Sequence, residues 1–380
     1  MDRHSPASTF HRRVSIAVLF FVAASASFAG YYNKWHFREP GLPGGVGTTL
    51  EWRFGLVDIL EGTALRPFVY RRLLPDIANW MDRETPSAIK DRLYNLAGKE
   101  IDVQDFIFVS PVARNPVYFY RYLILYVLSF LFTWLAAYAM YLVCKAIGLP
   151  PYACLLAPIF MILLMPYLLS AGGYYYDYPE LAFLALAIWM AWKFDWWWAL
   201  PLIAIATWNK ESFLLVIPAF YPIWRRRGTR NNALLAMSVS MLVSAGVYQL
   251  IRYQFLQNPG GAIQSKWRAQ LNFFIHPMRL LGWERTYGIP NFKAFSLIPL
   301  ALIIWTAWRG WGLLPVEIRR HGQIAAAINI PLFLLFCSPG EIRDLSFLYV
   351  LFMLLIAVNL SMETGGWGKQ EPQLPASSGE

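Results

Sequence analysis

The stretch WWWALPLIAIATWNKESFLLVIPAFYPIWRRR, residues 196–227, decides how this chain is threaded. Two apolar runs of about 12 residues flank the polar triplet Asn209-Lys210-Glu211, and the second run ends in the cluster Arg225-Arg226-Arg227. A helix of about 12 residues is about 18 Å long, whereas the hydrocarbon core of a bilayer is about 30 Å thick. We therefore predict two half-helices that meet at the triplet and return the chain to the side from which it came.

A single straight helix over 196–223 is the alternative. It would place Lys210 and Glu211 in lipid, at a cost of roughly 2.5–3.5 kcal/mol each on insertion scales. It would also move the arginine cluster to the far side and invert every later loop. A reversal that lines a wet cavity avoids both consequences, because irregular backbone is tolerated there.

The composition identifies lipid as the solvent of most of this chain. Of 380 residues, 57% are apolar, 17% are aromatic and 15% are charged, whereas soluble domains have about 25% charged residues. The 17 Trp, 21 Tyr and 26 Phe fit the aromatic belts of membrane proteins. These values exclude a disordered chain, a disulfide scaffold, a coiled coil and an ordinary cytosolic enzyme. They indicate a polytopic membrane protein.

The apolar runs predict an all-α membrane helix bundle of about eight full crossings plus the re-entrant half-helix pair, with interfacial helices in the first outer loop. The multi-pass domain covers 14–361, between an N-terminal segment 1–13 and a disordered tail 362–380. A cleaved signal peptide is the alternative for the first run, because Ala24-Ser25-Ala26 resembles a cleavage site. The expected crossings are 14–32, 117–144, 150–170, 178–192, 232–253, 294–308, 323–337 and 345–361.

The net charge of +10 is interpreted as an orientation signal and not as a nucleic-acid surface. We place Arg12 and Arg13 in the cytoplasm and include the reversal in the count of crossings. The cytoplasmic side then also carries Lys145, Lys193 and the cluster at 225–230. Both termini are then cytoplasmic, and the protein lies in the cytoplasmic membrane. The long segments 33–115 and 254–293 become outer loops.

The same topology gathers the remaining polar turns on the outer side. Each has a purely structural alternative: Asp177 could cap the next helix, Lys210 and Glu211 could pair with each other, and Glu341 and Arg343 could be interfacial anchors. Ionisable groups at membrane depth are nevertheless candidates for a functional site. We therefore predict that these five residues, which come from three separate outer turns, lie at similar depth and belong to a candidate site.

The first outer loop carries the most distinctive motif, Arg66-Pro67-Phe68-Val69-Tyr70-Arg71-Arg72-Leu73-Leu74-Pro75. Arginine suits bidentate phosphate binding, although an amphipathic interfacial helix that meets lipid head groups is the alternative. Leu73, Leu74, Ile77 and Trp80 would be the lipid-facing residues of that helix. Upstream, Glu51 or Asp58 could serve as a general base for a hydroxyl acceptor.

Several chemistries are not indicated. The sequence contains no phosphate-binding GxxxxGK[ST], no GxGxxG after a strand and no HExxH. The three cysteines, Cys144, Cys154 and Cys337, have no paired spacing and are expected to be packing residues. Basic residues of the loop 254–293 could hold a phosphate, or the loop could be structural.

In the order and spacing of four motifs, the chain resembles the GT-C superfamily of integral-membrane glycosyltransferases that use polyprenyl-phosphate sugars. The motifs are PFVYRRLLP at 67–75, Tyr-Asp-Tyr-Pro at 176–179, Asn-Lys-Glu at 209–211 and Gly-Glu-Ile-Arg at 340–343. The resemblance extends over roughly residues 14–361. It implies a GT-C-like bundle that transfers a sugar from a lipid carrier outside the cytoplasm.

The resemblance also implies roles for particular residues. Glu51 or Asp58 would be the base, although the loop lacks the acidic pair usual in that family. A divalent metal could assist at the phosphate, but the sequence shows no dedicated ligand set. The lipid-phosphate ligands would be Arg71, Arg72, Lys210 and Arg343, and Asp177, Glu211 and Glu341 would order them or bind sugar hydroxyls.

The predicted partners are a polyprenyl-phosphate-linked sugar, membrane lipids and an acceptor that is a glycan, a lipid or a protein, with no nucleic acid. Two other functions remain open. One is a transporter or flippase for a lipid-linked or amphipathic solute, which predicts polar residues throughout the membrane depth and internal repeats. The other is an envelope polysaccharide polymerase, which would also use arginines of outer loops.

Overall fold

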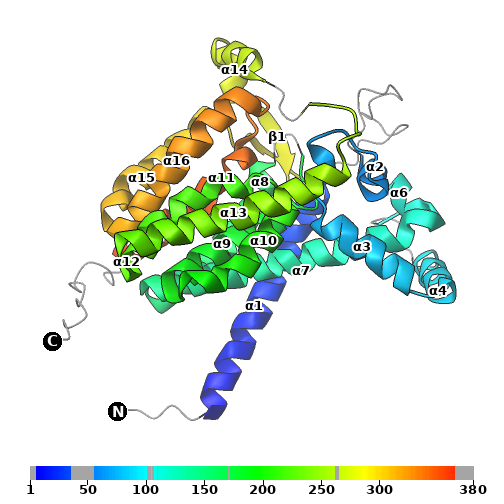
Figure 1. Ribbon diagram of the computed structural model, residues 1–380, viewed down its shortest axis with the longest axis horizontal. Helices are drawn as coiled ribbons and strands as arrows, with labels where there is room; N and C mark the ends of the chain where they lie inside the picture. Colours follow the sequence, from blue (N-terminus) through cyan, green and yellow to red (C-terminus); the bar gives the residue numbers. More distant parts are fainter. Residues whose placement is uncertain are drawn as a thin grey trace.

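The protein is described by a computed structural model that covers 6–35, 55–100, 104, 107–108, 110–169, 172–261 and 265–363, with side chains from residue 14 onward. It is mostly helical (Figure 1). The predicted helices are confirmed: α1 (Pro6–Tyr32), α7 (Pro116–Ile147), α8 (Pro151–Leu168), α9 (Asp177–Lys193), α13 (Arg230–Gln254), α15 (Leu297–Gly310), α16 (Val316–Phe336) and α17 (Tyr349–Glu363).

Within the described ranges, five helices are long and apolar enough to cross a membrane. Two predicted crossings are shorter, since α9 has 17 residues and α15 has 14. The structure therefore supports a helical membrane protein, while the count of eight crossings stays a prediction. The five helices are Val14–Tyr32, Pro116–Ile147, Pro151–Leu168, Arg230–Gln254 and Ile342–Glu363.

Local sequence signals set the ends of the longest helix. Asn115 caps α7, since its side chain accepts a hydrogen bond from the Val117 amide, and Pro116 occupies the first turn. The helix ends at Gly148, whose φ of 91° suits a residue without a Cβ. Pro150 and Pro151 then start α8, so α7 and α8 form an antiparallel pair that packs together.

The stretch 196–227 reverses as predicted. It begins with the 3₁₀ turn η3 (Trp196–Ala199) and continues into α10 (Leu200–Asn209), which ends because Lys210 adopts an extended backbone. The chain returns through α11 (Phe213–Val216), η4 (Ile217–Phe220) and α12 (Tyr221–Arg227). At its end, the Arg227 guanidinium donates a hydrogen bond of 2.7 Å to the Lys193 carbonyl. The two ends of the stretch therefore meet, which a single straight helix would not allow.

Other contacts place the basic connectors at the same end of the bundle, which we call the basic end. Trp192 Nε1 donates to the Ala146 carbonyl at 2.9 Å, which joins the last turn of α7 to the last turn of α9. Arg309 at the end of α15 pairs with Glu363 at the end of α17. The charge of these connectors predicts that they lie on one side, and the fold places them at one end of the bundle.

The first loop folds into short helices beside the N-terminal end of α7. The predicted amphipathic helix is α3, but Leu73 and Leu74 are buried against the protein and do not face lipid, whereas Trp80 is 56% exposed. The apolar face of α3 therefore packs on α7. The helices are α2 (Leu56–Glu61), η2 (Phe68–Tyr70), α3 (Leu73–Glu84), α4 (Ser87–Ala97) and α6 (Pro111–Arg114).

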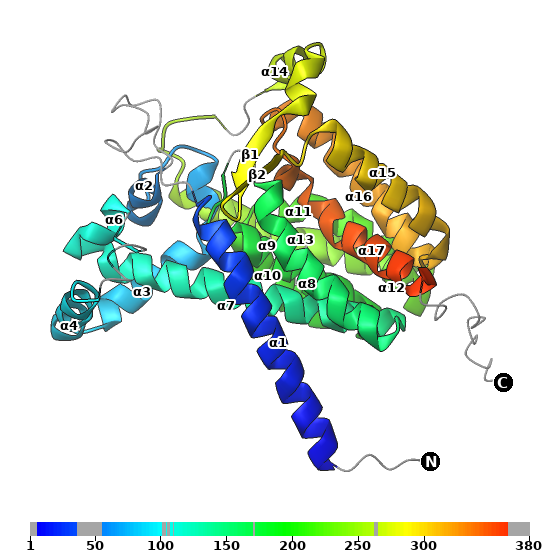
Figure 2. The same cartoon turned by 180° about the vertical axis from the view of Figure 1, so that it is seen from behind.

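The second loop adds a short β-hairpin to the predicted helical bundle. It contains α14 (Trp267–Phe274), η5 (Pro277–Leu281) and an antiparallel hairpin of β1 (Trp283–Thr286) and β2 (Ile289–Phe292) (Figure 2). The hairpin turn places Tyr287 against Gly30, where an added Cβ would lie 2.5 Å from the ring. Tyr287 also donates to the Leu163 carbonyl at 2.9 Å. The hairpin therefore fastens this loop to α1 and α8.

The three cysteines are free thiols, with Cys144 and Cys154 buried and Cys337 half-buried. This agrees with the packing role expected of them.

The chain between α15 and α17 contains two further 3₁₀ turns, η6 (Trp311–Leu313) and η7 (Ile342–Leu348).

The reversal makes a prediction about sidedness. In a chain without its natural cysteines, Gly228→Cys should react with a membrane-impermeant thiol reagent only from the cytoplasmic face, because the basic end is expected inside. The substitution fits, since Gly228 has extended backbone and its nearest neighbour is the flexible end of Asn232. Gln257→Cys, at an exposed position of the second loop, is the control and should react only from outside. Labelling of position 228 from outside would contradict the orientation.

Candidate functional site

The turn before α9 organises the opposite end of the bundle, which we call the site end. Tyr174 and Tyr176 stack with ring centroids 5.2 Å apart and planes at 9°. Asp177 is the first residue of α9, and its carboxylate accepts a hydrogen bond of 2.8 Å from the Tyr174 amide. It thus braces the turn that precedes the helix. The alternative of a helix cap is not supported, because α9 begins at Asp177 itself and its start has no side-chain capping hydrogen bond.

Arg343 is the most heavily paired cation at this end. Its guanidinium lies 3.3 Å from Asp177, 2.5 Å from Glu341 and 4.0 Å from Asp344. The guanidinium also lies 4.5 Å from the centroid of the Tyr174 ring. Arg343 and Glu341 are each only 9% exposed in their side chains, so the alternative of interfacial anchors is wrong.

Lys210 reaches across from the reversal to α9. Its ammonium donates a hydrogen bond of 2.7 Å to Glu180, whose other oxygen accepts one of 2.8 Å from Ser346. Lys210 therefore does not pair with its neighbour Glu211, which was the structural alternative. One buried carboxylate instead joins the reversal to η7.

Arg71 brings the first loop to the same place. Its guanidinium donates to the Tyr176 hydroxyl, lies 4.4 Å from the centroid of that ring and pairs with Glu211 at 3.6 Å. The structure therefore brings the three outer turns and the first loop together. The cluster unites three cations with five carboxylates around two stacked tyrosines: Arg71, Lys210 and Arg343 with Asp177, Glu180, Glu211, Glu341 and Asp344.

Burial changes the titration of this cluster. Burial raises the pKa of Glu341, and the nearby Asp344 raises it further while Arg343 opposes both. Burial also raises the pKa of Tyr176 well above its ordinary value, so this residue remains a neutral phenol. Glu341 can therefore take up a proton more easily than an exposed glutamate, and Tyr176 serves as a neutral ring and hydrogen-bond partner.

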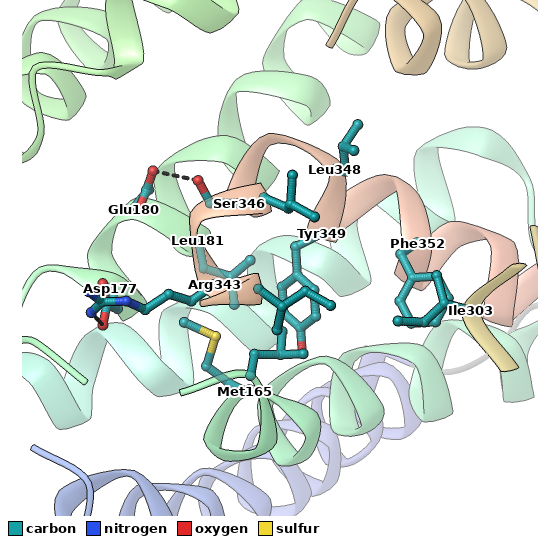
Figure 3. A pocket seen from close by; sticks show the side chains of 13 residues that line it. Met165, Asp177, Glu180, Leu181, Ile303, Arg343, Ser346, Leu348, Tyr349 and Phe352 are labelled. Atoms are coloured by element: carbon teal, nitrogen blue, oxygen red, sulfur yellow. Dashed lines mark hydrogen bonds and ion pairs between the residues drawn. The ribbon is translucent and has the colours of Figure 1, made fainter. Parts of the chain in front are cut away.

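A cavity opens beside the cluster between α8, α15 and α17 (Figure 3). It contains about 700 Å³ of space that no protein atom occupies, including the part open to the surface. Arg343, Asp177 and Glu180 lie at one end and Phe352 and Ile303 at the other. Apart from Ser346 and Tyr349, the remaining lining is aliphatic: Met165, Leu168, Leu181, Ile342, Leu345 and Leu348.

Two of the predicted residues are not part of this arrangement. Arg72 is buried elsewhere, with its guanidinium 2.5 Å from Asp76 and donating to the Ile59 carbonyl. Asp58 lies on α2, where its carboxylate accepts a hydrogen bond of 3.3 Å from Thr63. Glu51 lies outside the described residues. The structure therefore leaves the assignment of the base as a prediction.

Sequence reasoning missed Glu180 and the stacked tyrosines. Glu180 follows Asp177 by three residues, so both carboxylates lie on one face of the first turn of α9. That spacing could have identified Glu180. The pairing of Lys210 with a residue 30 positions earlier has no local signal.

Among the described residues, no group of three or more His, Cys, Asp or Glu side chains could hold a metal ion.

Together these features define a helical membrane protein with a paired-charge cluster at one end of an apolar cavity. Comparisons of the chain with protein-family models, with curated proteins and with solved structures found no match. The function must therefore be argued from the site itself.

The Lys210–Glu180 pair makes a prediction about stability. Lys210→Met should lower the free energy of unfolding by about 3 kcal/mol, because it leaves the buried Glu180 without its cation. The double variant Lys210→Met/Glu180→Gln should recover part of this loss. Denaturant unfolding of the detergent-solubilised chain measures both. Equal stability of the single variant and the parent would show that the pair does not stabilise the fold.

Proposed function

We propose that this chain is a membrane glycosyltransferase that moves a sugar from a polyprenyl-phosphate carrier to a hydroxyl of an envelope glycan, lipid or protein. The observation that carries the proposal is the cavity, which has charge at one end and an apolar lining along the rest. A prenyl phosphate has the same division, an ionic head on a long hydrocarbon chain.

The head group would lie against Arg343, which lines the cavity, with Lys210 behind Glu180. The Nε of Arg343 has no hydrogen-bond partner among the described residues, although its side chain is 91% buried. A phosphate oxygen could accept from this nitrogen. The added negative charge would be offset by proton uptake at Glu341, whose pKa burial already raises.

The reaction would be a displacement at the anomeric carbon of the sugar. The acceptor oxygen forms a bond to that carbon, the bond from carbon to the phosphate oxygen breaks, and the carrier leaves as a prenyl phosphate. The acceptor proton passes to a carboxylate, for which Glu51 or Asp58 are the candidates. Arg343 and Lys210 would stabilise the charge that develops on the leaving phosphate.

The charge distribution supports this function over a transporter. The three cations and five carboxylates of the cluster lie at the site end, whereas the cavity away from it is lined by aliphatic and aromatic side chains. A path for a polar solute would need polar groups along the membrane depth. In the proposed orientation, the site end faces outward from the cytoplasmic membrane and both termini are inside.

Arg343→Lys should reduce transfer of a labelled sugar from polyprenyl phosphate by about a hundredfold or more. Lysine keeps the charge that the three neighbouring carboxylates require but loses the planar set of donors. The matched control is Arg309→Lys, at the basic end, which should retain parental activity. Full activity of Arg343→Lys in nanodiscs that contain the donor would contradict the proposal.

The base assignment has its own test. Either Glu51→Gln or Asp58→Asn should abolish sugar transfer, because an amide cannot accept the proton of the acceptor hydroxyl. Thermal unfolding of each variant should match the parent, since the change is isosteric. Transfer that survives the double substitution would remove both residues as bases.

A further inference from the structure

The second outer loop carries an exposed apolar surface that the candidate site does not use. Its segment 265–283 folds as α14 and η5, lies outside every predicted crossing and is found beside the end of α16 (Figure 1). Large exposed apolar patches on a protein mark contact surfaces. The apolar side chains of this segment that are 42–76% exposed are Trp267, Leu271, Phe274, Ile275, Met278, Leu281 and Trp283.

The face of α14 toward the protein is held by hydrogen bonds to the end of α16. Gln270 is 2% exposed, and its amide nitrogen donates hydrogen bonds of 3.1 and 3.2 Å to the carbonyls of Phe333 and Cys337. The Lys266 amide donates to the Leu335 carbonyl at 2.7 Å. α14 therefore starts where α16, a predicted crossing, ends.

A different face of α14 carries the exposed apolar residues. Trp267, Leu271 and Phe274 are spaced at i, i+4 and i+7, so they form one stripe along the helix. Leu271 follows Gln270 by one residue, which is about 100° around an α-helix. Asn272 lies another step further round and belongs to the polar face. The apolar stripe is therefore separate from the face that is hydrogen-bonded to α16.

Exposed apolar residues of the neighbouring helices lie at the same end of the bundle. Leu297, at the start of α15, is 51% exposed, and Leu335, near the end of α16, is 45% exposed. A Cβ added to Gly340, just before the apolar span Ile342–Glu363, would lie 3.7 Å from the Phe273 ring of α14. α14 therefore lies at the level where membrane helices begin and end.

The charges of this segment distinguish lipid from a protein partner. Its cations are Lys266, Arg268 and Arg279, and 265–283 contains no Asp or Glu. Helices that lie in a membrane interface combine Trp, Phe and Leu on one face with Lys and Arg on the other. A second copy of this chain, packed on the same stripe, would bring two basic edges together. A phospholipid surface suits both the apolar stripe and the cations.

We infer that α14 and η5 form an interfacial anchor, which inserts its exposed apolar residues into the outer leaflet of the membrane. Its cations then lie at the level of the lipid head groups. This anchor is independent of the proposed sugar transfer, because it is argued from the surface of the second loop alone.

The anchor is also packed against the wall of the cavity. On its protein side, the Phe273 ring lies 5.7 Å from the ring of Phe295, which lies 5.7 Å from the ring of Phe333. The same apolar cluster contains Ile342, which lines the cavity. A helix fixed in the outer leaflet therefore supports one side of the cavity.

Site-directed spin labelling of the full chain tests the anchor in nanodiscs of phosphatidylcholine and phosphatidylglycerol. In a chain without its natural cysteines, a nitroxide at Leu271→Cys should collide mainly with oxygen, which concentrates in lipid. A nitroxide at Asn272→Cys, on the polar face, should collide mainly with a water-soluble nickel chelate. The ratio of oxygen to nickel collisions should differ about fivefold or more between these two neighbours.

Two further labelled variants provide the references. Leu242→Cys, 72% exposed on the apolar span α13, represents lipid, and Gln257→Cys, exposed in the second loop, represents water. Thermal unfolding of each variant should match the cysteine-free parent, since all four side chains are exposed. Nickel access at position 271 equal to that at 257 would place the helix in water and overturn the inference. Protection of position 271 from both reagents would show a covering protein surface in place of lipid and would also overturn it.

Discussion

Pairing of buried charge is the constraint on which the site end depends. An ionised carboxylate loses several kcal/mol of hydration when it is buried, and only well-placed cations and hydrogen bonds offset that loss. Arg343 meets this requirement for Asp177 and Glu341, and Lys210 does so for Glu180. These pairs join α9, the reversal and η7, so the packing of three separate segments is linked to one electrostatic arrangement.

The same arrangement gives the site its chemical character. Carboxylates outnumber cations, and burial raises the pKa of Glu341. The stacked tyrosines, each close to one guanidinium, separate the contacts of Arg71 from those of Arg343. Under the proposed function, Arg343 faces the lipid phosphate in the cavity, whereas Arg71 contacts the reversal through Glu211.

Much of the fold followed from patterns that are local in sequence. Apolar run lengths predicted the helices, and Asn209-Lys210-Glu211 predicted the reversal, because charged residues at the middle of a lipid-facing helix are costly. The β-hairpin at 283–292 was not predicted, since its register depends on the contact of Tyr287 with α1 and α8. Leu73 and Leu74 were assigned to lipid because amphipathicity alone does not distinguish lipid from a neighbouring helix.

By itself, the sequence determined which turns carry charge and at which end of the bundle the basic connectors lie, because charge is scarce and each charged turn must lie at an end. Only the tertiary structure decided the partners. Lys210 pairs with Glu180 and not with Glu211, and Arg72 turns to Asp76 and away from the cluster. Partner choice depends on distances across helices that are far apart in the chain, and no local pattern records those distances.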